Sequence, residues 1–507
     1  MSEKLNVLFI ITDAMRADHM SCAGNPTIKT PNLDKLAKEG TRFTNHYCTN
    51  PICMPNRASL LTGVYPNVHG VRSNGINLRQ DIPTITQTLN KRGWYTAAIG
   101  KIHHQYWLGP FKHRSRSAES LIDWAHDRDK SYPVRNHFPL PYYGYEEVEV
   151  ISGNGTVCAG HYTEWLEEKA PKIAEDMKQR VLNYDNLFSI TCDPIPDQLY
   201  NTTWVAERAL SFLKRYSNGD YGNKPFYLHC SFPDPHWPLN PPKKYQDKYK
   251  PEDIELPISF KDIKNLYSHE YLGDHLRKPP FRRAFIREST EEEVRQLTAL
   301  TYAAIAYIDH YIGKILASLE KYGYSDNTII VFMSDHGDLM GDHGLLFKGP
   351  CPFNGVLQIP LIWKVPGYKK SNISESLVSS IDYPKTILNL LDIPDRYHPS
   401  GMQGYNIIPI LENPNKEVRD CVFIENDEEV GTLTARLRHL ITMDYKLTIY
   451  SDLSNFGDIY DRNNDPHELN NLWFSKEFKP KRFQLVNKLL HESLKAQSIY
   501  PQRIAGT

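Results

Sequence analysis

The sequence lacks three features that would assign it to a class at once. It has no charge excess, because 59 lysines and arginines stand against 60 aspartates and glutamates, which argues against a nucleic-acid binder acting through bulk electrostatics. Its N-terminal apolar run, Leu5–Ile11, is too short and too poorly flanked for a membrane span or a secretory signal. Its eight cysteines include no Cys-x-x-Cys pair, so they describe neither a zinc knuckle nor a disulfide framework.

These absences predict a cytoplasmic, reduced protein with no nucleic-acid partner and no membrane contact. The 507 residues exceed one ordinary domain, so we expect a large core domain with a smaller partner. The abundance of 31 Tyr, 8 Trp and 35 Pro indicates long, ordered, aromatic-rich loops. A homo-oligomer is compatible with the sequence.

Strand and helix signals alternate along the first 412 residues, which predicts a doubly wound, mostly parallel α/β sheet. The run Leu5–Thr12 is apolar throughout, as in a strand covered on both faces. The other predicted strands are Tyr95–Ile99, Phe226–Ser231 and Thr328–Ser334. The predicted helices are Pro31–Lys38, Thr84–Arg92, Glu291–Tyr322 and a helix that follows Pro384 and runs to Leu391.

Two insertions and a change of pattern complete the predicted organisation. The stretches from His103 to about Tyr145 and Pro238–Arg287 read as irregular loops over the site, where substrate choice would be made. From residue 413 the pattern changes to short strands, Val422–Glu425, Leu437–Met443 and Lys446–Tyr450, followed by a helix near Lys481–Gln497. We therefore predict an α/β domain over 1–412 and an α+β subdomain over 413–507.

Four polar residues follow predicted strands: Asp13, Lys101, His236 and Asp335. Ligands of open parallel sheets bind beyond the carboxyl ends of the strands. These four side chains are therefore expected at one edge.

The stretch CMPNRASLLTG begins at Cys53 and looks like the start of a helix. A cysteine followed by Pro two residues on and Arg four residues on would arise by chance roughly 0.02 times in this chain. From the residues alone, Cys53 is either a nucleophile with a lowered thiol pKa at a helix N-terminus or a small buried residue at a turn.

The motif Cys53-x-Pro55-x-Arg57 with Leu61-Thr62-Gly63 resembles the signature of type I sulfatases of the alkaline phosphatase superfamily. Further segments that resemble this family are NVLFIITDAMRAD, Gly100-Lys101-Ile102-His103, Ser231-Phe232-x-x-Pro235-His236-x-Pro238, Ser334-Asp335-His336-Gly337, Gly341-Asp342-His343-Gly344, Lys348, Ile459-Tyr460-Asp461, Asp465-Pro466-x-Glu468 and Asn471-Leu472. The resemblance covers nearly the whole chain.

The resemblance implies that a formylglycine-generating maturation enzyme converts Cys53 to formylglycine. The hydrated aldehyde has two hydroxyls, of which one attacks sulfur and the other later expels sulfate. It also implies one divalent cation on Asp13, residue 53, Asp335 and His336, with calcium as first choice and manganese as the alternative. Many members carry a second aspartate where this chain has Ala14, which cannot be a ligand.

The resemblance also assigns catalytic roles. Arg57 would steady the hydrated aldehyde, Lys101 would hold the aldehyde hydrate and the sulfate, and His103 would take the proton that drives elimination. His236 and Lys348 would bind sulfate oxygens and help to protonate the departing alcohol. No separate cofactor-binding residues are predicted, and His69, His343, Asp338 and Asp342 read as structural.

The implied substrate is a small sulfate monoester: aryl, sugar or small alkyl. A first alternative is a phosphonate monoester or phosphodiester hydrolase, in which Tyr and Thr typically stand at the positions of Lys101 and His103. A second is a non-catalytic relative that binds sulfated ligands, and a third is an enzyme that uses the unmodified Cys53 thiolate.

Overall fold

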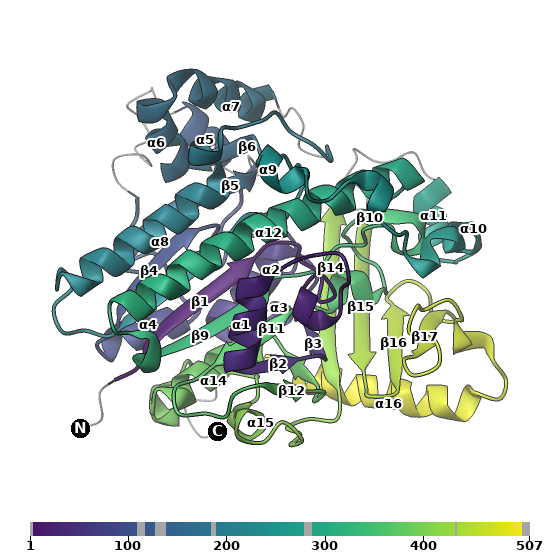
Figure 1. The fold of residues 1–507 in the computed structure, drawn as a ribbon. Coiled ribbons are helices and arrows are strands. Elements are labelled where there is room, and N and C mark those ends of the chain that lie inside the picture. Colours follow the sequence, from purple (N-terminus) through teal and green to yellow (C-terminus); the bar gives the residue numbers. More distant parts are fainter. Residues whose placement is uncertain are drawn as a thin grey trace.

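The computed structural model describes residues 4–108, 117–126, 138–183, 189–277, 286–430 and 433–498. Its centre is a nine-stranded sheet with the strand order β12-β2-β11-β9-β1-β7-β4-β5-β6 (Figure 1). The strands are β1 (Asn6–Thr12), β2 (Thr41–Phe43), β4 (Tyr95–Gly100), β5 (Glu147–Asn154), β6 (Val157–Gly160), β7 (Phe226–Ser231), β9 (Thr328–Ser334), β11 (Leu361–Lys364) and β12 (Asn372–Ser374). The central strand β1 is parallel to both neighbours, β7 and β9.

Helices cover both faces of this sheet, as the apolar run of β1 predicts. Alternate residues of β1 enter two cores: Leu8 and Ile10 pack in one, Val7 and Phe9 in the other. The first core contains side chains of α1 (Pro31–Glu39), α8 (Asn201–Ser217) and α12 (Glu291–Lys321), and the second contains side chains of α2 (Cys53–Thr62), α4 (Ile85–Lys91) and α14 (Asp382–Leu390). The expected doubly wound, mostly parallel fold is confirmed.

The other elements are short or lie outside the main sheet. The helices are α3 (Pro66–His69), α5 (Leu121–His126), α6 (His161–Lys169), α7 (Pro171–Asn183), α9 (Lys243–Gln246), α10 (Ile263–Leu266), α11 (Leu272–Arg277), α13 (Asn354–Leu357), α15 (Ile408–Glu412) and α16 (Lys479–Lys495). Two small sheets pair β3 (His46–Tyr47) with β13 (Val378–Ser379) and β8 (Ile286–Glu288) with β10 (Leu345–Phe347). No helix within the described ranges is long and apolar enough to cross a membrane.

The two insertions are more regular than expected. The first contains α5, and the second contains α9, α10, α11 and β8. Their short helices carry too few turns to show a helical period in the sequence. Residues 109–116, 127–137 and 278–285 of these insertions lie outside the described residues.

A four-stranded antiparallel sheet and α16 form the C-terminal part, drawn in yellow-green and yellow in Figure 1. Its strands are β14 (Val422–Val430), β15 (Leu433–Ile441), β16 (Tyr445–Tyr450) and β17 (Gly457–Asp461). The first two are longer than predicted because their pairing continues through charged residues, where the apolar alternation stops: Arg438 of β15 forms an ion pair with Asp427 of β14 at 2.5 Å. Cross-strand charge pairs of this kind stabilise a sheet without an apolar signal.

The boundary at residue 412 stays a prediction, and the cores on its two sides are shared. Phe353 and Leu357 pack in one cluster with Val422 and Ile441. In addition, Glu468 accepts a hydrogen bond from the Asn354 backbone N–H at 2.9 Å. The C-terminal sheet therefore completes cores that begin in the larger unit.

A chain that ends at residue 412 is expected to lose cooperative folding. Truncation would expose the apolar side chains of the shared clusters, and each large buried side chain contributes about 1.5–3 kcal/mol. Thermal unfolding followed by circular dichroism tests this. A cooperative transition near that of the full chain would show that the C-terminal part is dispensable for folding.

Candidate active site

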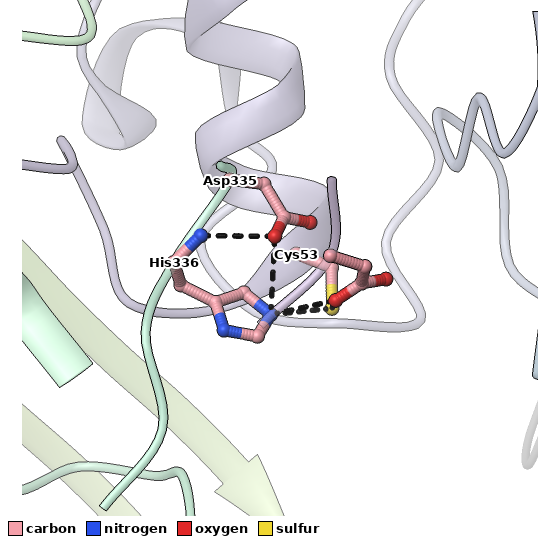
Figure 2. Close-up of side chains that lie close together, drawn as sticks. Cys53, Asp335 and His336 are labelled. Atoms are coloured by element: carbon pink, nitrogen blue, oxygen red, sulfur yellow. Dashed lines mark hydrogen bonds and ion pairs between the residues drawn. The ribbon is translucent and has the colours of Figure 1, made fainter. Parts of the chain in front are cut away.

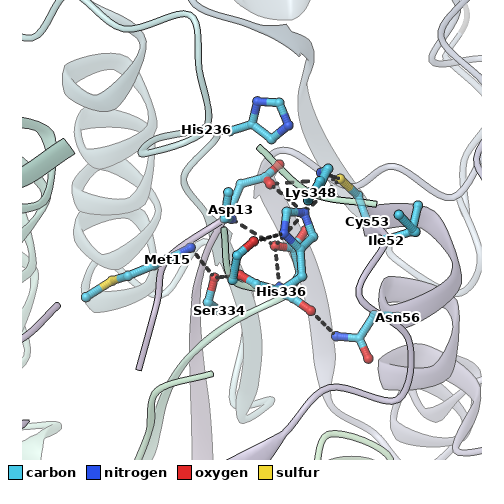
Figure 3. A network of polar contacts seen from close by, with 12 residues as sticks. Asp13, Met15, Ile52, Cys53, Asn56, His236, Ser334, His336 and Lys348 are labelled. Atoms are coloured by element: carbon cyan, nitrogen blue, oxygen red, sulfur yellow. Dashed lines mark hydrogen bonds and ion pairs between the residues drawn. The ribbon is translucent and has the colours of Figure 1, made fainter. Parts of the chain in front are cut away.

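The polar residues that follow the sheet strands meet at one edge, as the sequence predicts. Asp13 follows β1, Lys101 follows β4, and Asp335 and His336 follow β9, while the N-terminus of α2 brings Cys53 to the same place (Figures 2 and 3). Gly100 ends β4 with φ 96°, and a Cβ there would lie 1.8 Å from the Ser231 carbonyl oxygen. Only glycine allows β4 to end this close to β7.

Four side chains form the only candidate metal cluster found among the described residues: Asp13, Cys53, Asp335 and His336. All four are buried, and their ligand atoms lie within 4.8 Å of one another. His336 Nε2 is 3.1 Å from Cys53 Sγ and 3.2 Å from Asp13 Oδ1. Its Nδ1 lies 2.7 Å from the Gly337 carbonyl oxygen, so Nδ1 carries the proton and Nε2 presents its lone pair to the cluster.

Backbone contacts hold the carboxylates of this cluster in place. Ala14 donates its N–H to Asp335 Oδ1 at 3.2 Å. Ala14 adopts φ 62°, a left-handed conformation that costs a non-glycine residue about 1 kcal/mol or more. Asn56 Nδ2 donates to the Asp335 carbonyl oxygen at 2.5 Å, which links α2 to the end of β9 (Figure 3).

Cys53 is the first residue of α2, a helix in which every side chain is buried. The side chain of Asn74 accepts a hydrogen bond from the Met54 N–H at 3.1 Å and so satisfies one open donor of the helix N-terminus. Burial raises the pKa of the Cys53 thiol, but Lys348 and His336 lower it more, so the net shift is downward. The structure therefore favours negative charge at this position.

Arg57 connects three strand ends. Its Nε donates to Asp335 Oδ2 at 2.7 Å, and its Nη1 donates to the Lys101 carbonyl oxygen at 2.8 Å and to Ser231 Oγ at 3.0 Å. Its Nη2 is buried and makes no hydrogen bond within the described residues. Arg57 thus binds the carboxylate of Asp335, and its Nη2 also forms a longer ion pair with Asp13 Oδ2 at 3.9 Å.

Two lysines place positive charge around Cys53. Lys348 Nζ lies 2.7 Å from Cys53 Sγ and 2.6 Å from His336 Nε2. Lys101 Nζ lies 3.9 Å from Cys53 Sγ and forms an ion pair with Asp13. Both lysines are buried. Burial lowers the pKa of Lys101 well below its ordinary value, while the ion pair with Asp13 favours its ammonium form.

His103 reaches the site by a route that simple strand alternation does not predict. Because β4 ends at Gly100 and His103 has φ 58°, a turn and not an extended strand sets its direction. The carboxylate of Glu119 accepts the backbone N–H groups of His103 at 2.6 Å, His104 at 2.8 Å and Gln105 at 3.2 Å. Glu119 thus fixes the turn that carries His103.

Replacing Glu119 by Gln is expected to destabilise the protein by about 1–3 kcal/mol, because an amide NH₂ would face backbone donors that need an acceptor. The free energy of unfolding in urea measures this loss. Glu168→Gln, at an exposed position of α6, is the matched control and should change the stability by less than about 0.5 kcal/mol. Equal stability of the two variants would contradict the role given to Glu119.

His236 follows β7 and lies beside the cluster of Asp13, Cys53 and His336 (Figure 3). Its Nδ1 is 2.6 Å from the Trp237 carbonyl oxygen, so this nitrogen carries a proton and Nε2 is free. Burial lowers the pKa of His236 well below its ordinary value, and Lys348 and Lys101 add to the shift. His236 is therefore neutral near pH 7.

The four residues predicted to be structural contact other parts of the fold. His69 bonds to Ser59 at 3.0 Å, and His343 pairs with Asp262 at 2.8 Å. Asp338 accepts the indole N–H of Trp237 at 3.2 Å, and Asp342 pairs with Arg16 at 2.6 Å. None of these contacts involves Cys53.

Two residues that hold the site had different signals in the sequence. Asn56 lies inside the Cys53 motif, so the motif itself draws attention to this residue in the sequence. Glu119 lies in an irregular stretch and is one of many acidic residues, so no local pattern distinguishes it. Its role appears only when three consecutive amide groups are seen to converge on it.

Comparison with known proteins shows the family of this chain. Residues 5–393 match the Sulfatase family. Residues 341–497 match the family that describes the C-terminal region of N-sulphoglucosamine sulphohydrolase. An arylsulfatase of Clostridium perfringens is 30% identical over 508 residues, covering 97% of this chain and 95% of the relative. The multifunctional alkaline phosphatase superfamily protein PehA of Trinickia caryophylli is 30% identical over 500 residues, covering 92% and 91%.

A solved structure has the same fold over almost its whole length. The phosphonate monoester hydrolase of Agrobacterium radiobacter superposes with a TM-score of 0.77 at 23% identity, covering 98% of this chain and 97% of that chain. The match to the Sulfatase family covers most of the residues that form the main sheet and the Cys53 cluster. The chain therefore belongs to the sulfatase family of the alkaline phosphatase superfamily, and it is a sulfatase enzyme.

Proposed function

We propose that this sulfatase hydrolyses a small sulfate monoester through a hydrated formylglycine made from Cys53, with one divalent cation. The observation that carries the proposal is the surroundings of Cys53 Sγ. His336 and Asp13 lie 3.1 and 3.9 Å away, and Lys348 and Lys101 lie 2.7 and 3.9 Å away. Ligands for a cation and donors for an anion thus converge on one side chain.

The donor set fits a divalent cation. Two carboxylates and one imidazole with its lone pair directed inward would hold the ion together with an oxygen of residue 53. Oxygen-rich sets of this kind suit Ca²⁺, and the single nitrogen also admits Mn²⁺. When bound, the ion would supply positive charge beside the sulfate group.

Residue 53 would supply the covalent chemistry. One hydroxyl of its hydrate would give its proton to the Asp13 carboxylate, 3.9 Å from Cys53 Sγ, and form a bond to sulfur as the bond from sulfur to the alcohol oxygen breaks. Loss of the second hydroxyl's proton would then expel sulfate and restore the aldehyde. Lys101 and Lys348 would hold the sulfate oxygens through their ammonium groups. Arg57 would keep the Asp335 carboxylate in place and direct its Nη2 donor into the site.

His103 and Lys348 would transfer the protons of the second hydroxyl and of the alcohol, and His236 would orient the alcohol. Burial lowers the pKa of His103 well below its ordinary value, with Lys101 and Arg57 adding to the shift, so His103 is a neutral base for the second hydroxyl. His236 is neutral, while Lys348 places its N–H donors 2.7 Å from Cys53 Sγ. Lys348 would therefore protonate the departing alcohol and His236 would orient it.

A phosphonate monoester or phosphodiester hydrolase is the second candidate. The relative PehA is named as multifunctional, and a phosphonate monoester hydrolase shares the fold. Against this reading, the chain has Lys101 and His103, where such hydrolases typically have Tyr and Thr. We therefore propose sulfate esters as the main substrates and phosphorus esters as weaker ones.

The test uses the protein produced together with a formylglycine-generating enzyme. We expect kcat/KM for 4-nitrophenyl sulfate to exceed the values for a 4-nitrophenyl phosphonate monoester and for bis(4-nitrophenyl) phosphate by at least about tenfold, a transition-state difference of about 1.4 kcal/mol. A higher value for either phosphorus ester would assign the main activity to the second candidate. Binding of sulfate esters without turnover would favour a non-catalytic relative.

A further inference from the structure

Trp107 contacts two of the proposed catalytic residues through one ring. Its indole lies parallel to the His103 imidazole, with ring centroids 3.6 Å apart and an interplanar angle of 12°. The ammonium of Lys101 lies 4.4 Å from the centroid of the indole. We propose that Trp107 is a positioning residue that fixes the ring of His103 and the ammonium of Lys101 relative to residue 53.

The Nδ1 of His103 lacks the carbonyl acceptor that orients the other two histidines of the site. The proposed metal ligand His336 is oriented by the Gly337 carbonyl oxygen at 2.7 Å, and His236 is oriented by the Trp237 carbonyl oxygen at 2.6 Å. His103 is buried, but its Nδ1 is buried without a hydrogen bond within the described residues. A general base is usually oriented by a hydrogen bond from a third group. Here the stacked indole takes that place.

The backbone fixes where the His103 side chain begins but leaves its ring free to rotate. The left-handed conformation of residue 103 and the Glu119 carboxylate set the position of the main chain. Rotation about the side-chain bonds is limited only by packing, and a flat aromatic face against the imidazole limits it most. Trp107 is itself held by the Leu121 N–H, which donates to its carbonyl oxygen at 2.8 Å.

The contact with Lys101 gives the same ring a second effect. An ammonium over the face of an indole is attracted by the ring electrons, so the indole holds Lys101 Nζ on the side of the site that faces Asp13 and residue 53. Trp107 is partly exposed, whereas Lys101 and His103 are buried beneath it. The ring thus also shields both groups from solvent.

This inference rests on the proposed function, because it assumes that His103 and Lys101 act in turnover. Misplacement of a catalytic group by about 1 Å lowers the rate by up to about 10²-fold. A group that positions the base and the ammonium should therefore change kcat more than KM.

The test compares Trp107→Phe with Trp107→Leu. Both side chains are apolar and smaller than tryptophan, but only phenylalanine offers an aromatic face to His103 and Lys101. We expect kcat of the leucine variant to fall by about 10- to 100-fold with KM changed less than about threefold, and phenylalanine to restore kcat to within about threefold of the parent. Equal kcat values for the two variants, or a change confined to KM, would overturn the proposal.

Two further measurements separate positioning from general damage. In the spectrum of ¹³C-labelled histidine, assigned with His103→Ala, the ring signals of His103 should show an upfield ring-current shift that disappears in Trp107→Leu. In the double variant Trp107→Leu, His103→Ala, the combined loss of kcat should be smaller than the product of the two single losses. A shift that persists in Trp107→Leu, or losses that multiply, would contradict a role through His103.

The design also separates this inference from the proposed function. Kinetics are measured on whichever sulfate, phosphonate or phosphate ester the parent enzyme turns over fastest. If a phosphorus ester is preferred, the substrate assignment fails while the comparison of phenylalanine with leucine still tests Trp107. If the parent turns over none of these esters, the role of Trp107 in turnover is overturned as well.

Discussion

Cys53→Ala is expected to lower kcat on a sulfate monoester by at least about 10⁴-fold, the scale on which removal of a covalent nucleophile acts. The described neighbours within 4 Å of its sulfur have other proposed roles, because Lys101 and Lys348 bind the anion while His336 and Asp13 hold the cation. The assay is release of 4-nitrophenol under substrate saturation. Activity within tenfold of the parent would exclude residue 53 as the nucleophile.

Cys53→Ser is the matched variant that tests how sulfate leaves. A serine hydroxyl can attack sulfur, but it lacks the second hydroxyl whose deprotonation expels sulfate. We expect at most one equivalent of alcohol per enzyme, followed by a stalled adduct that intact-protein mass spectrometry would detect. Continued turnover by this variant would show that water attacks the adduct directly.

Pro55→Ala provides a control that leaves every proposed catalytic side chain in place. Pro55 lies in the first turn of α2 and contacts no proposed substrate group, but it is one of the three positions that define the modification signal. We expect this variant to keep a thiol at residue 53 and to have as little activity as Cys53→Ala. Full activity with an intact thiol would favour the unmodified thiolate reading.

Loss of the cation is expected to have the second largest effect. Dialysis against a chelator should lower kcat by about 10³-fold, since a metal ion supplies several kcal/mol of charge stabilisation in the transition state. Added Ca²⁺ or Mn²⁺ should restore activity, and the more effective ion identifies the resident metal. Activity that survives exhaustive chelation, with no metal found by elemental analysis, would contradict a metal site.

Asp335→Asn tests the same metal site by changing one of its proposed ligands. Burial raises the pKa of Asp335, but Arg57, His336 and Lys101 lower it more, so it is a carboxylate at neutral pH. An amide would keep the shape and remove the charge, so metal content should fall together with activity. Asp18→Asn is the control, because this carboxylate is 61% exposed and its ion pair with Arg16 contributes at most about 1 kcal/mol.

The parts of the site that the sequence predicted are those carried by parallel strands. Apolar strands that end on Asp13 and Asp335 must bring those residues to one sheet edge, whatever the intervening loops do. The start of the helix at Cys53 was predicted from its motif, and the structure shows that the helix ends at Gly63 in a left-handed conformation. For these elements local pattern and global fold agree, so sequence reasoning succeeds.

The parts that the sequence did not predict depend on contacts between distant segments. Nothing near Glu119 indicates that it accepts three consecutive amide groups, and nothing near Trp107 indicates that its ring lies on His103. Lys101 and His103 follow a predicted strand, but a turn with a left-handed His103 sets the direction of the His103 side chain. Tertiary contacts, not local propensity, select that conformation.

The mass of the tryptic peptide that spans residues 43–57 tests the central claim most directly. The peptide contains Cys48 and residue 53, so Cys48 serves as an internal thiol. From protein produced with a formylglycine-generating enzyme and alkylated after unfolding, we predict one alkyl group, on Cys48, and an aldehyde in place of the CH₂SH group of residue 53. Two alkyl groups, one on each cysteine, in protein that hydrolyses sulfate esters at its full rate would contradict the account.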